Sequence, residues 1–418
     1  MNSKSNFKNI LTLILCGIAG SVIYKLPYLR ETYYTALMEA TGTTNSQLGM
    51  LMGAYGIVNL ILYLPSGYCA DRFSARKLMT FSLISTGLLG FYFATMPSFT
   101  MILLIHCVWA ITTVFTFWTV CVRIIRELGD SKTQGKYYGT WSALKGITSV
   151  IIGFISVPLF SKLGEGVNGL KGTINFYSVI CIVVGIACWF VIDDGVKDGA
   201  KSAFKFSDMG YVLKMPLVWI CGFIAMAVWV CYTCFSYVTP YLHEVYGLTE
   251  TETALVSNIR AYVLFAVGGF LGGILADKTK TRSLFLAFCF AGISALSVYY
   301  AISPQTAGVG AVIAIMIFMG AGIYCGNAVF YSLIDECRVP LKYAGTAAGI
   351  VSAVAYATDT FLWTTTGSML DAAPGVAGYR HLFTLQTVVA VIGLILCLVM
   401  HNSVMKARKN APIEAKAE

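Results

Sequence analysis

Long apolar runs recur along the whole 418-residue chain. A bilayer core of about 30 Å needs about 20 apolar residues in a helix. A scan at that length finds twelve segments, with residue ranges 10–37, 46–66, 78–95, 99–122, 137–160, 173–192, 215–242, 250–275, 283–302, 308–334, 343–369 and 380–402. Backbone that faces lipid must satisfy its own hydrogen bonds, and the alternation of a barrel strand is absent from these runs. The sequence therefore predicts an all-α membrane protein with twelve transmembrane helices.

The composition excludes several other classes of protein. Hydrophobic residues make up 57% of the chain and charged residues 12%, about half the charged fraction of a soluble domain. A soluble enzyme, a disordered chain and a nucleic-acid-binding domain are therefore excluded. The 13 cysteines lie mostly within apolar runs, which predicts buried free thiols rather than disulfides or a zinc site. No metal or cofactor is expected.

Basic residues set the orientation in the membrane. Of the 29 Lys and Arg residues, 22 lie in segments on one side of the predicted spans, and only Lys162, Lys171 and Arg380 lie on the other. This asymmetry places both termini in the cytoplasm, with the chain in a bacterial inner membrane. It also explains the net charge of +9 without nucleic acid as a partner.

The sequence carries signs of an internal duplication. The longest polar run, residues 193–210, separates six spans from six. Asp71 and Asp277, each preceded by glycine four positions earlier, are 206 residues apart, and so are Gly139 and Gly345. We expect two six-helix bundles with the substrate site at their interface, near the membrane midplane. The predicted domains are an N-terminal bundle over 1–192, a cytoplasmic linker over 193–214 and a C-terminal bundle over 215–418.

The repeated motif resembles a known family. Gly67-x-x-x-Asp71-Arg72-x-x-x-Arg76-Lys77 is similar to the loop motif of the major facilitator superfamily, with a weaker copy over 273–282. The resemblance implies two pseudo-symmetric bundles that rock about a central site. Within the superfamily, Lys25–Arg30 and the region around the seventh span are similar to organophosphate and organic-anion carriers. The resemblance also implies cytoplasmic gating residues, which are Asp71, Arg72, Arg76, Arg123 and Asp277.

Ionisable residues inside the predicted spans are the main clue to the cargo. Such a residue costs about 2.5–3.5 kcal/mol at the bilayer centre and usually serves function. Lys25, Arg30 and Arg260 lie inside spans, with Lys145 nearer a span end, whereas Asp359 is the one acid near the middle of a span. A surplus of cations favours an anion, because Arg and Lys bind carboxylate and phosphate.

Each interior charge has an alternative role. For Lys25 the alternative is snorkelling, and for Arg30 it is contact with the outer interface or a pair with Glu31, which lies nearer an end of the span. Arg260 is either a ligand contact or a structural partner of Asp359. Asp359 is a counter-ion, a proton carrier or a ligand contact, and we favour the counter-ion; Trp363, four positions on, is expected on its face of the helix. Lys145 is expected to act at a gate or to snorkel rather than to bind cargo.

A polar line in the tenth span completes the predicted site. Tyr324 and Asn327 are three positions apart and suit a hydroxylated ligand, although such stripes also serve helix packing. The predicted substrate-binding residues are Lys25, Arg30, Arg260, Tyr324, Asn327 and Asp359.

The favoured function is secondary active transport of a small organic anion by alternating access, driven by a proton or a counter-anion. We expect a monomer and no enzymatic activity, because no metal cluster or nucleophile–base pair is found in the loops. The main alternative is a proton-coupled exporter of drug-like or apolar compounds, in which Asp359 carries the proton. A membrane sensor that binds ligand without transport is a further alternative.

Overall fold

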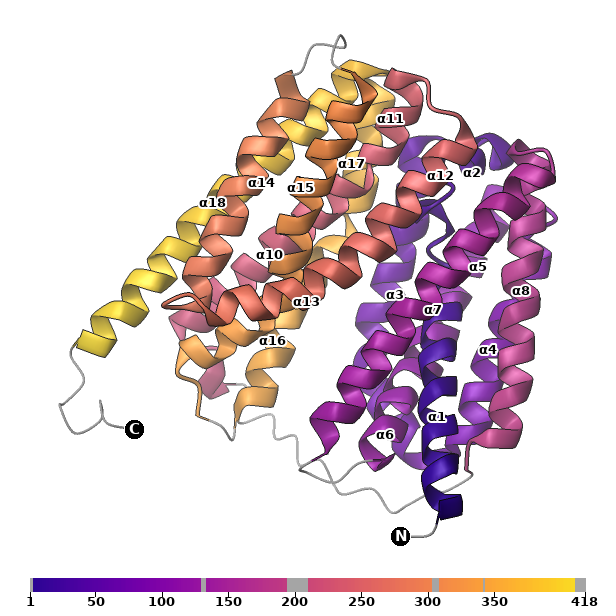
Figure 1. The fold of residues 1–418 in the computed structure, drawn as a ribbon, viewed down its shortest axis with the longest axis horizontal. Helices are drawn as coiled ribbons and strands as arrows, with labels where there is room; N and C mark the ends of the chain where they lie inside the picture. The colour runs from indigo at the N-terminus through magenta and orange to yellow at the C-terminus, as the bar shows by residue number, and fades with distance from the viewer. Residues whose placement is uncertain (1–2, 129–132, 194–209, 303–307, 341–342, 410–418) are drawn as a thin grey trace. The chain divides into compact units, whose positions relative to one another are not determined.

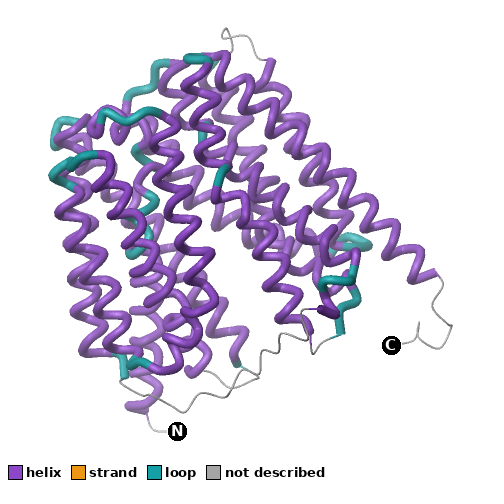
Figure 2. Tube along the Cα trace, turned by 180° about the vertical axis from the view of Figure 1, so that it is seen from behind, coloured by secondary structure: helices purple, strands orange, loops and turns teal. Residues whose placement is uncertain are grey.

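The structure is a computed structural model that describes residues 3–128, 133–193, 210–302, 308–340 and 343–409. Within these residues the chain is helical, with short loops between helices and no strand (Figures 1 and 2). Most of the predicted linker over 193–214 lies outside the described residues.

The first part of the chain forms six helical segments between its N-terminus and residue 128. They are α1 (Ser3–Val22), α2 (Tyr34–Thr41), α3 (Asn45–Arg72), α4 (Ala75–Phe93), α5 (Phe99–Ala110) and α6 (Thr119–Leu128), with a short 3₁₀ turn η1 (Leu29–Glu31) and a π-helical segment η2 (Ile111–Trp118). Two long helices follow, α7 (Gln134–Lys162) and α8 (Gly166–Val191).

The remaining helices follow the linker. They are α10 (Pro216–Ser236), α11 (Val238–Tyr246), α12 (Glu250–Asn258), the π-helical η3 (Ile259–Val263), α13 (Leu264–Asp277), α14 (Arg282–Ile302), α15 (Val309–Val329), η4 (Phe330–Cys337), α16 (Ala344–Tyr356), η6 (Ala357–Thr360), α17 (Leu362–Ala372) and α18 (Val376–Lys409).

Several helix starts are fixed by local sequence. Thr44 and Gln47 form a capping box before α3, and Thr249 with Glu252 forms another before α12. In each box the threonine hydroxyl and the side chain three residues later satisfy backbone N–H groups that a helix leaves unpaired. Pro216 occupies the first turn of α10, where its missing N–H costs nothing.

Nine helices within the described residues are long and apolar enough to cross a membrane. Two other predicted spans are interrupted instead of continuous. The first span breaks after α1, around Pro27, into η1 and α2, and the eleventh breaks at η6 between α16 and α17. The third, α4, begins with Arg76 and Lys77, which lower its mean hydropathy. Helix breaks within the membrane are found where backbone lines a site or is covered by protein.

The chain divides into two compact units. The first unit comprises Met1–Ser202, Leu242–Val263 and Asp359–Ser368, and the second comprises Ala203–Tyr241, Leu264–Thr358 and Met369–Glu418. The predicted C-terminal bundle over 215–418 therefore contributes two short segments to the packing of the first unit.

Within the first unit, α1 packs against α7 and α8, and α4 packs along α8 (Figure 1). The segment around Trp363 packs directly on α3, because a Cβ at Gly49 would lie 2.2 Å from the Trp363 carbonyl oxygen. Within the second unit, α14 packs along α18, α13 along α15, and α10 against α16 and α18.

Candidate functional site

Lys25 lies in the break between α1 and η1, in the first unit. Its side chain is 4% exposed. The ammonium donates to the Ser149 carbonyl oxygen on α7 at 3.0 Å and lies 3.4 Å from the centre of the Tyr262 ring. A cation over a ring face gains electrostatic attraction that grows when water is excluded. Within the described residues no carboxylate lies within ion-pair distance of Lys25.

Arg30 follows on η1 and is 5% exposed. Its guanidinium carbon lies 4.4 Å from the centre of the Trp363 ring and 5.1 Å from that of Tyr34. Trp363 is held in turn by Asp359, whose carboxylate accepts a hydrogen bond from the indole nitrogen at 2.9 Å. This contact confirms that Trp363 shares a helix face with Asp359, and it joins Arg30 to Asp359 through one aromatic ring.

Arg260 is fully buried, and Glu31 is an acidic partner of its guanidinium. One guanidinium nitrogen lies 2.6 Å from the Glu31 carboxylate and 3.2 Å from the Glu31 carbonyl oxygen. Glu31 is itself only 6% exposed. Arg260 sits in the π-helical segment η3, and such one-turn departures from α-helix are frequent at functional sites.

These five ionisable residues form one cluster in the first unit, defined here as Lys25, Arg30, Glu31, Arg260 and Asp359. It contains three cations and two carboxylates, so it carries one formal positive charge. Glu31 offsets Arg260 at close range. Among the described residues Lys25 has no carboxylate at ion-pair distance.

Tyr324 and Asn327 belong to the second unit. Tyr324 is 1% exposed on α15, and its ring centre lies 5.5 Å from that of Phe265 and 6.1 Å from those of Tyr232 and Phe235. Asn327 is half-buried on the same helix. Tyr324 thus takes part in an aromatic cluster with edge-to-face geometry, the packing alternative noted for this stripe.

The predicted gating residues of the first motif copy make separate contacts. The side chain of Asp71 lies outside the described residues. Arg72 lies 5.3 Å from the Tyr68 ring centre, Arg76 donates to the Ile192 carbonyl oxygen at 2.8 Å, and Arg123 donates to the Ala70 carbonyl oxygen. Both arginines therefore bind backbone near a helix end. Arg76 binds Ile192, just after α8, and Arg123 binds Ala70, in the last turn of α3.

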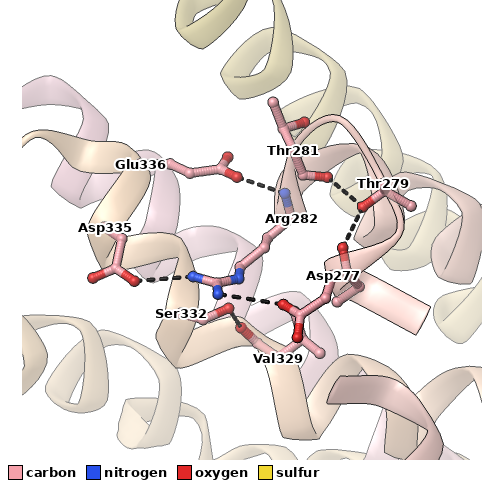
Figure 3. Close-up of polar contacts among 9 residues, drawn as sticks. Asp277, Thr279, Thr281, Arg282, Val329, Ser332, Asp335 and Glu336 are labelled. Carbon is pink, nitrogen blue, oxygen red and sulfur yellow. Dashed lines mark hydrogen bonds and ion pairs between the residues drawn. The ribbon is translucent and has the colours of Figure 1, made fainter. Parts of the chain in front are cut away.

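The second motif copy forms a charged network in the second unit. Figure 3 shows the Arg282 guanidinium between the carboxylates of Asp277 and Asp335, at 3.5 and 3.0 Å. Glu336 accepts from the Arg282 backbone nitrogen at 2.5 Å and so caps the start of α14. The predicted gating residue Asp277 thus contacts the arginine of its own motif. The network borders an open pocket of about 590 Å³ that also includes Lys280, Arg338 and Arg408.

Some site residues are not identified from the sequence. Glu31 is assigned there to the end of a span, and Ser149 and Tyr262 carry no charge that would single them out. Tyr262 has one usable signal, because it lies two positions from Arg260 in an otherwise apolar segment. The 13 cysteines are all free thiols, as expected. No group of three possible metal ligands is found among the described residues.

Comparison with known proteins identifies the family. The sequence profile of the Major Facilitator Superfamily matches residues 11–358. The chain therefore belongs to this superfamily, which its loop motif resembles. The all-α membrane fold expected from its apolar runs is confirmed. A solved structure of the same fold is a bacterial homolog of the human lysosomal transporter Spinster in an inward-facing, unoccupied conformation. The TM-score is 0.78 at 15% identity, over 97% of this chain and 99% of that one.

Curated relatives extend over most of the sequence. Inner membrane proteins YqcE and YihN of Escherichia coli K12 are 30% identical over 403 residues and 31% identical over 419 residues. The alignment covers 94% of both chains for YqcE and 98% of both for YihN. A probable hexose phosphate transport protein of Chlamydia muridarum is 24% identical over 282 residues, 57% of each chain.

Proposed function

We propose that this protein is a secondary active transporter that moves a small organic anion across a bacterial inner membrane by alternating access. The cargo class comprises sugar acids, other carboxylates and phosphorylated metabolites. The similarity to a probable hexose phosphate transport protein supports an anionic cargo. The similarity to two inner membrane proteins supports the location. The excess of basic residues on one side of the spans supports cytoplasmic termini.

The observation that carries the proposal is the state of Lys25. Moving an ammonium group out of water costs several kcal/mol unless a counter-charge offsets it. Arg260 has such a counter-charge in Glu31, whereas Lys25 is held by a carbonyl oxygen and a ring face. A buried cation without a carboxylate is expected where an anionic ligand supplies the missing charge.

Arg30 is the second proposed anion contact. Its guanidinium lies over the rings of Trp363 and Tyr34, and an arginine guanidinium binds carboxylate or phosphate with two hydrogen bonds. Arg260 has a positioning role in this proposal, because its charge is already offset by Glu31. Tyr324 and Asn327 remain proposed substrate-binding residues, Asp359 is proposed as a counter-ion to the cations, and the coupling partner is a proton or a counter-anion.

The gating role of the loop motif is also a proposal. Asp71, Arg72, Arg76, Arg123 and Asp277 are expected to hold the cytoplasmic ends of helices and to release them in each transport cycle. Asp71→Asn should therefore lower the transport rate more than the substrate affinity. An unchanged rate in proteoliposomes would count against this role.

Counterflow in proteoliposomes tests the function. The purified protein is preloaded with an unlabelled anion, and uptake of labelled glucuronate, glucose 6-phosphate or lactate is measured. We expect saturable uptake of at least one anion by the wild type and at least a tenfold loss with Lys25→Gln. Lys162→Gln, at the exposed end of α7, is the matched control and should behave as wild type.

The outcomes separate the candidate functions. Uptake of an apolar compound driven by a proton gradient, with no anion uptake, would support the exporter. Saturable anion binding without flux would support a sensor. Either result would overturn the proposed transport of anions.

A further inference from the structure

A second basic residue lies on the same face of α7 as the contact of Lys25. Trp141, Lys145 and Ser149 are four residues apart in turn, so their side chains follow one another along one helix face. The Ser149 carbonyl oxygen accepts from the Lys25 ammonium. Lys145 therefore lies about one helical turn, or about 6 Å along the axis, from Ser149, which accepts the hydrogen bond of Lys25.

Two indole rings surround Lys145. Its ammonium lies 5.3 Å from the ring centres of both Trp118 and Trp141. The rings lie 5.4 Å apart at an angle of 43°. The Trp141 indole nitrogen donates to the Cys16 carbonyl oxygen on α1 at 3.1 Å, which fixes the orientation of that ring. The Lys145 stem passes close to Gly20 of α1, where an added Cβ would lie 3.5 Å from Lys145 Cδ, an ordinary van der Waals contact.

Exposure differs along this row of residues. Lys145 and Trp118 are half-buried, whereas Lys25 is 4% exposed. Within the described residues Lys145, like Lys25, has no carboxylate at ion-pair distance. Lys145 on α7 and Lys25, which contacts α7 one turn further on, each lie beside aromatic rings. This arrangement suits an anion attached to an apolar ring face.

We propose that Lys145, Trp118 and Trp141 form a second binding subsite of the first unit, specific for anions derived from sugars. The half-buried Trp118 ring packs against the C–H face of the sugar ring, and Trp141, which is 6% exposed, supports Trp118 and Lys145. Lys145 binds the carboxylate or phosphate before the anion reaches Lys25. This proposal rests on the proposed function and narrows its cargo to ring-bearing anions. Lys145 selects for the anionic group, and the indole ring selects for the sugar ring.

Ligand pairs that differ in the ring test the subsite. Binding to the full-length protein in lipid nanodiscs is measured by titration calorimetry. Glucose 6-phosphate is compared with glycerol 3-phosphate, and glucuronate with lactate. The phosphate and carboxylate arms show which anionic group is preferred. Trp118→Leu should weaken the ring-bearing member of a binding pair about 3- to 10-fold, the range of an aromatic contact, and the ringless member less than 2-fold.

The charge is tested separately. Lys145→Gln should weaken both members of a pair at least fivefold, and Lys145→Arg should retain binding. Trp219→Leu, a half-exposed tryptophan of the second unit, and Lys162→Gln are the controls. The unfolding temperature of each variant is measured first, and Trp118→Phe replaces Trp118→Leu if the latter is unstable.

The results also separate this inference from the function on which it rests. If anions bind but the Trp118 variants weaken both members of a pair equally, or neither, the sugar subsite is overturned while anion transport stands. If Lys145→Gln binds as wild type, Lys145 is only a packing residue and the inference again fails. If no anion binds the wild type, the proposed function and this inference fail together.

Discussion

The Arg260 guanidinium and the Glu31 carboxylate are joined at 2.6 Å although 229 residues separate them. Both side chains are buried, at 0% and 5% exposure. The pair fastens the π-helical segment η3 to the 3₁₀ turn η1, two irregular segments within predicted spans. The pair therefore joins the segment that carries Arg30 to the segment whose Tyr262 contacts Lys25.

Removing one member of this pair should destabilise the protein strongly. Glu31→Gln leaves the Arg260 charge buried without its counter-charge, and we expect a loss of about 3–5 kcal/mol in the free energy of unfolding. The measurement is denaturant unfolding of the purified protein in detergent, followed by tryptophan fluorescence. Glu252→Gln, in the exposed capping box of α12, is the control and should cost less than 1 kcal/mol.

Removing both charges should restore part of that stability. In the double variant Glu31→Gln, Arg260→Gln no uncompensated charge remains, so the loss should be smaller than the sum of the two single losses. Additive losses would show that the two side chains do not interact as the structure places them.

The packing of α3 gives a second prediction. A Cβ at Gly49 would lie 2.2 Å from the Trp363 carbonyl oxygen and 2.6 Å from its carbonyl carbon, and backbone cannot move aside as a flexible side chain can. Gly49→Ala should therefore lower the free energy of unfolding by about 1–3 kcal/mol. Gly146→Ala on α7, where nothing lies within 4 Å of the added Cβ, should be neutral or slightly stabilising. Equal unfolding temperatures for the two variants would contradict the close approach.

The membrane fold follows from the sequence because its signals are additive over many residues. A run of about twenty apolar residues still predicts a span if one residue changes, and the same holds for the basic loops and the repeated motif. These signals therefore identify the spans and the family. The break in the first span is also readable, since Pro27 lies between two charges and cannot continue a helix. The break at η6 has no such residue, and the sequence shows only that Asp359 lies deep in the span.

The pairing of the interior charges does not follow from the sequence. Depth along a span is set by residue number, but the direction of a side chain depends on which helices pack beside it. Arg260 was therefore compatible with Asp359 as much as with Glu31. Aromatic partners are harder still, because Tyr262 and Trp363 have the composition of ordinary helix packing, and only coordinates place them against Lys25 and Arg30.

The charged network of Figure 3 gives a third prediction. It compares the contribution of a helix cap to stability with that of a surface ion pair. Glu336 accepts from two backbone nitrogens at the start of α14, those of Arg282 and Ser283. Glu336→Ala should therefore cost about 0.5–2 kcal/mol. Asp335 is 76% exposed beside Arg282, and Asp335→Ala should cost less than about 1 kcal/mol. Unfolding of both variants at low and high salt measures this. A larger loss with Asp335→Ala would reverse the assignment.

The last prediction separates the charge of Asp359 from its hydrogen bond. Asp359 Oδ1 accepts from the Trp363 indole nitrogen at 2.9 Å, and an asparagine at this position keeps an oxygen acceptor while losing the charge. Asp359→Asn should therefore keep the contact with Trp363. Because it removes one of two carboxylates from a cluster with three cations, it should lower the KM for a transported anion about fivefold, the change that corresponds to about 1 kcal/mol. Asp359→Ala, which also loses the contact with Trp363, should be less stable.

Initial rates in proteoliposomes give the KM. If Asp359→Asn instead abolishes proton-driven uptake while counterflow persists, Asp359 carries the coupling proton and is not a counter-ion to the cluster.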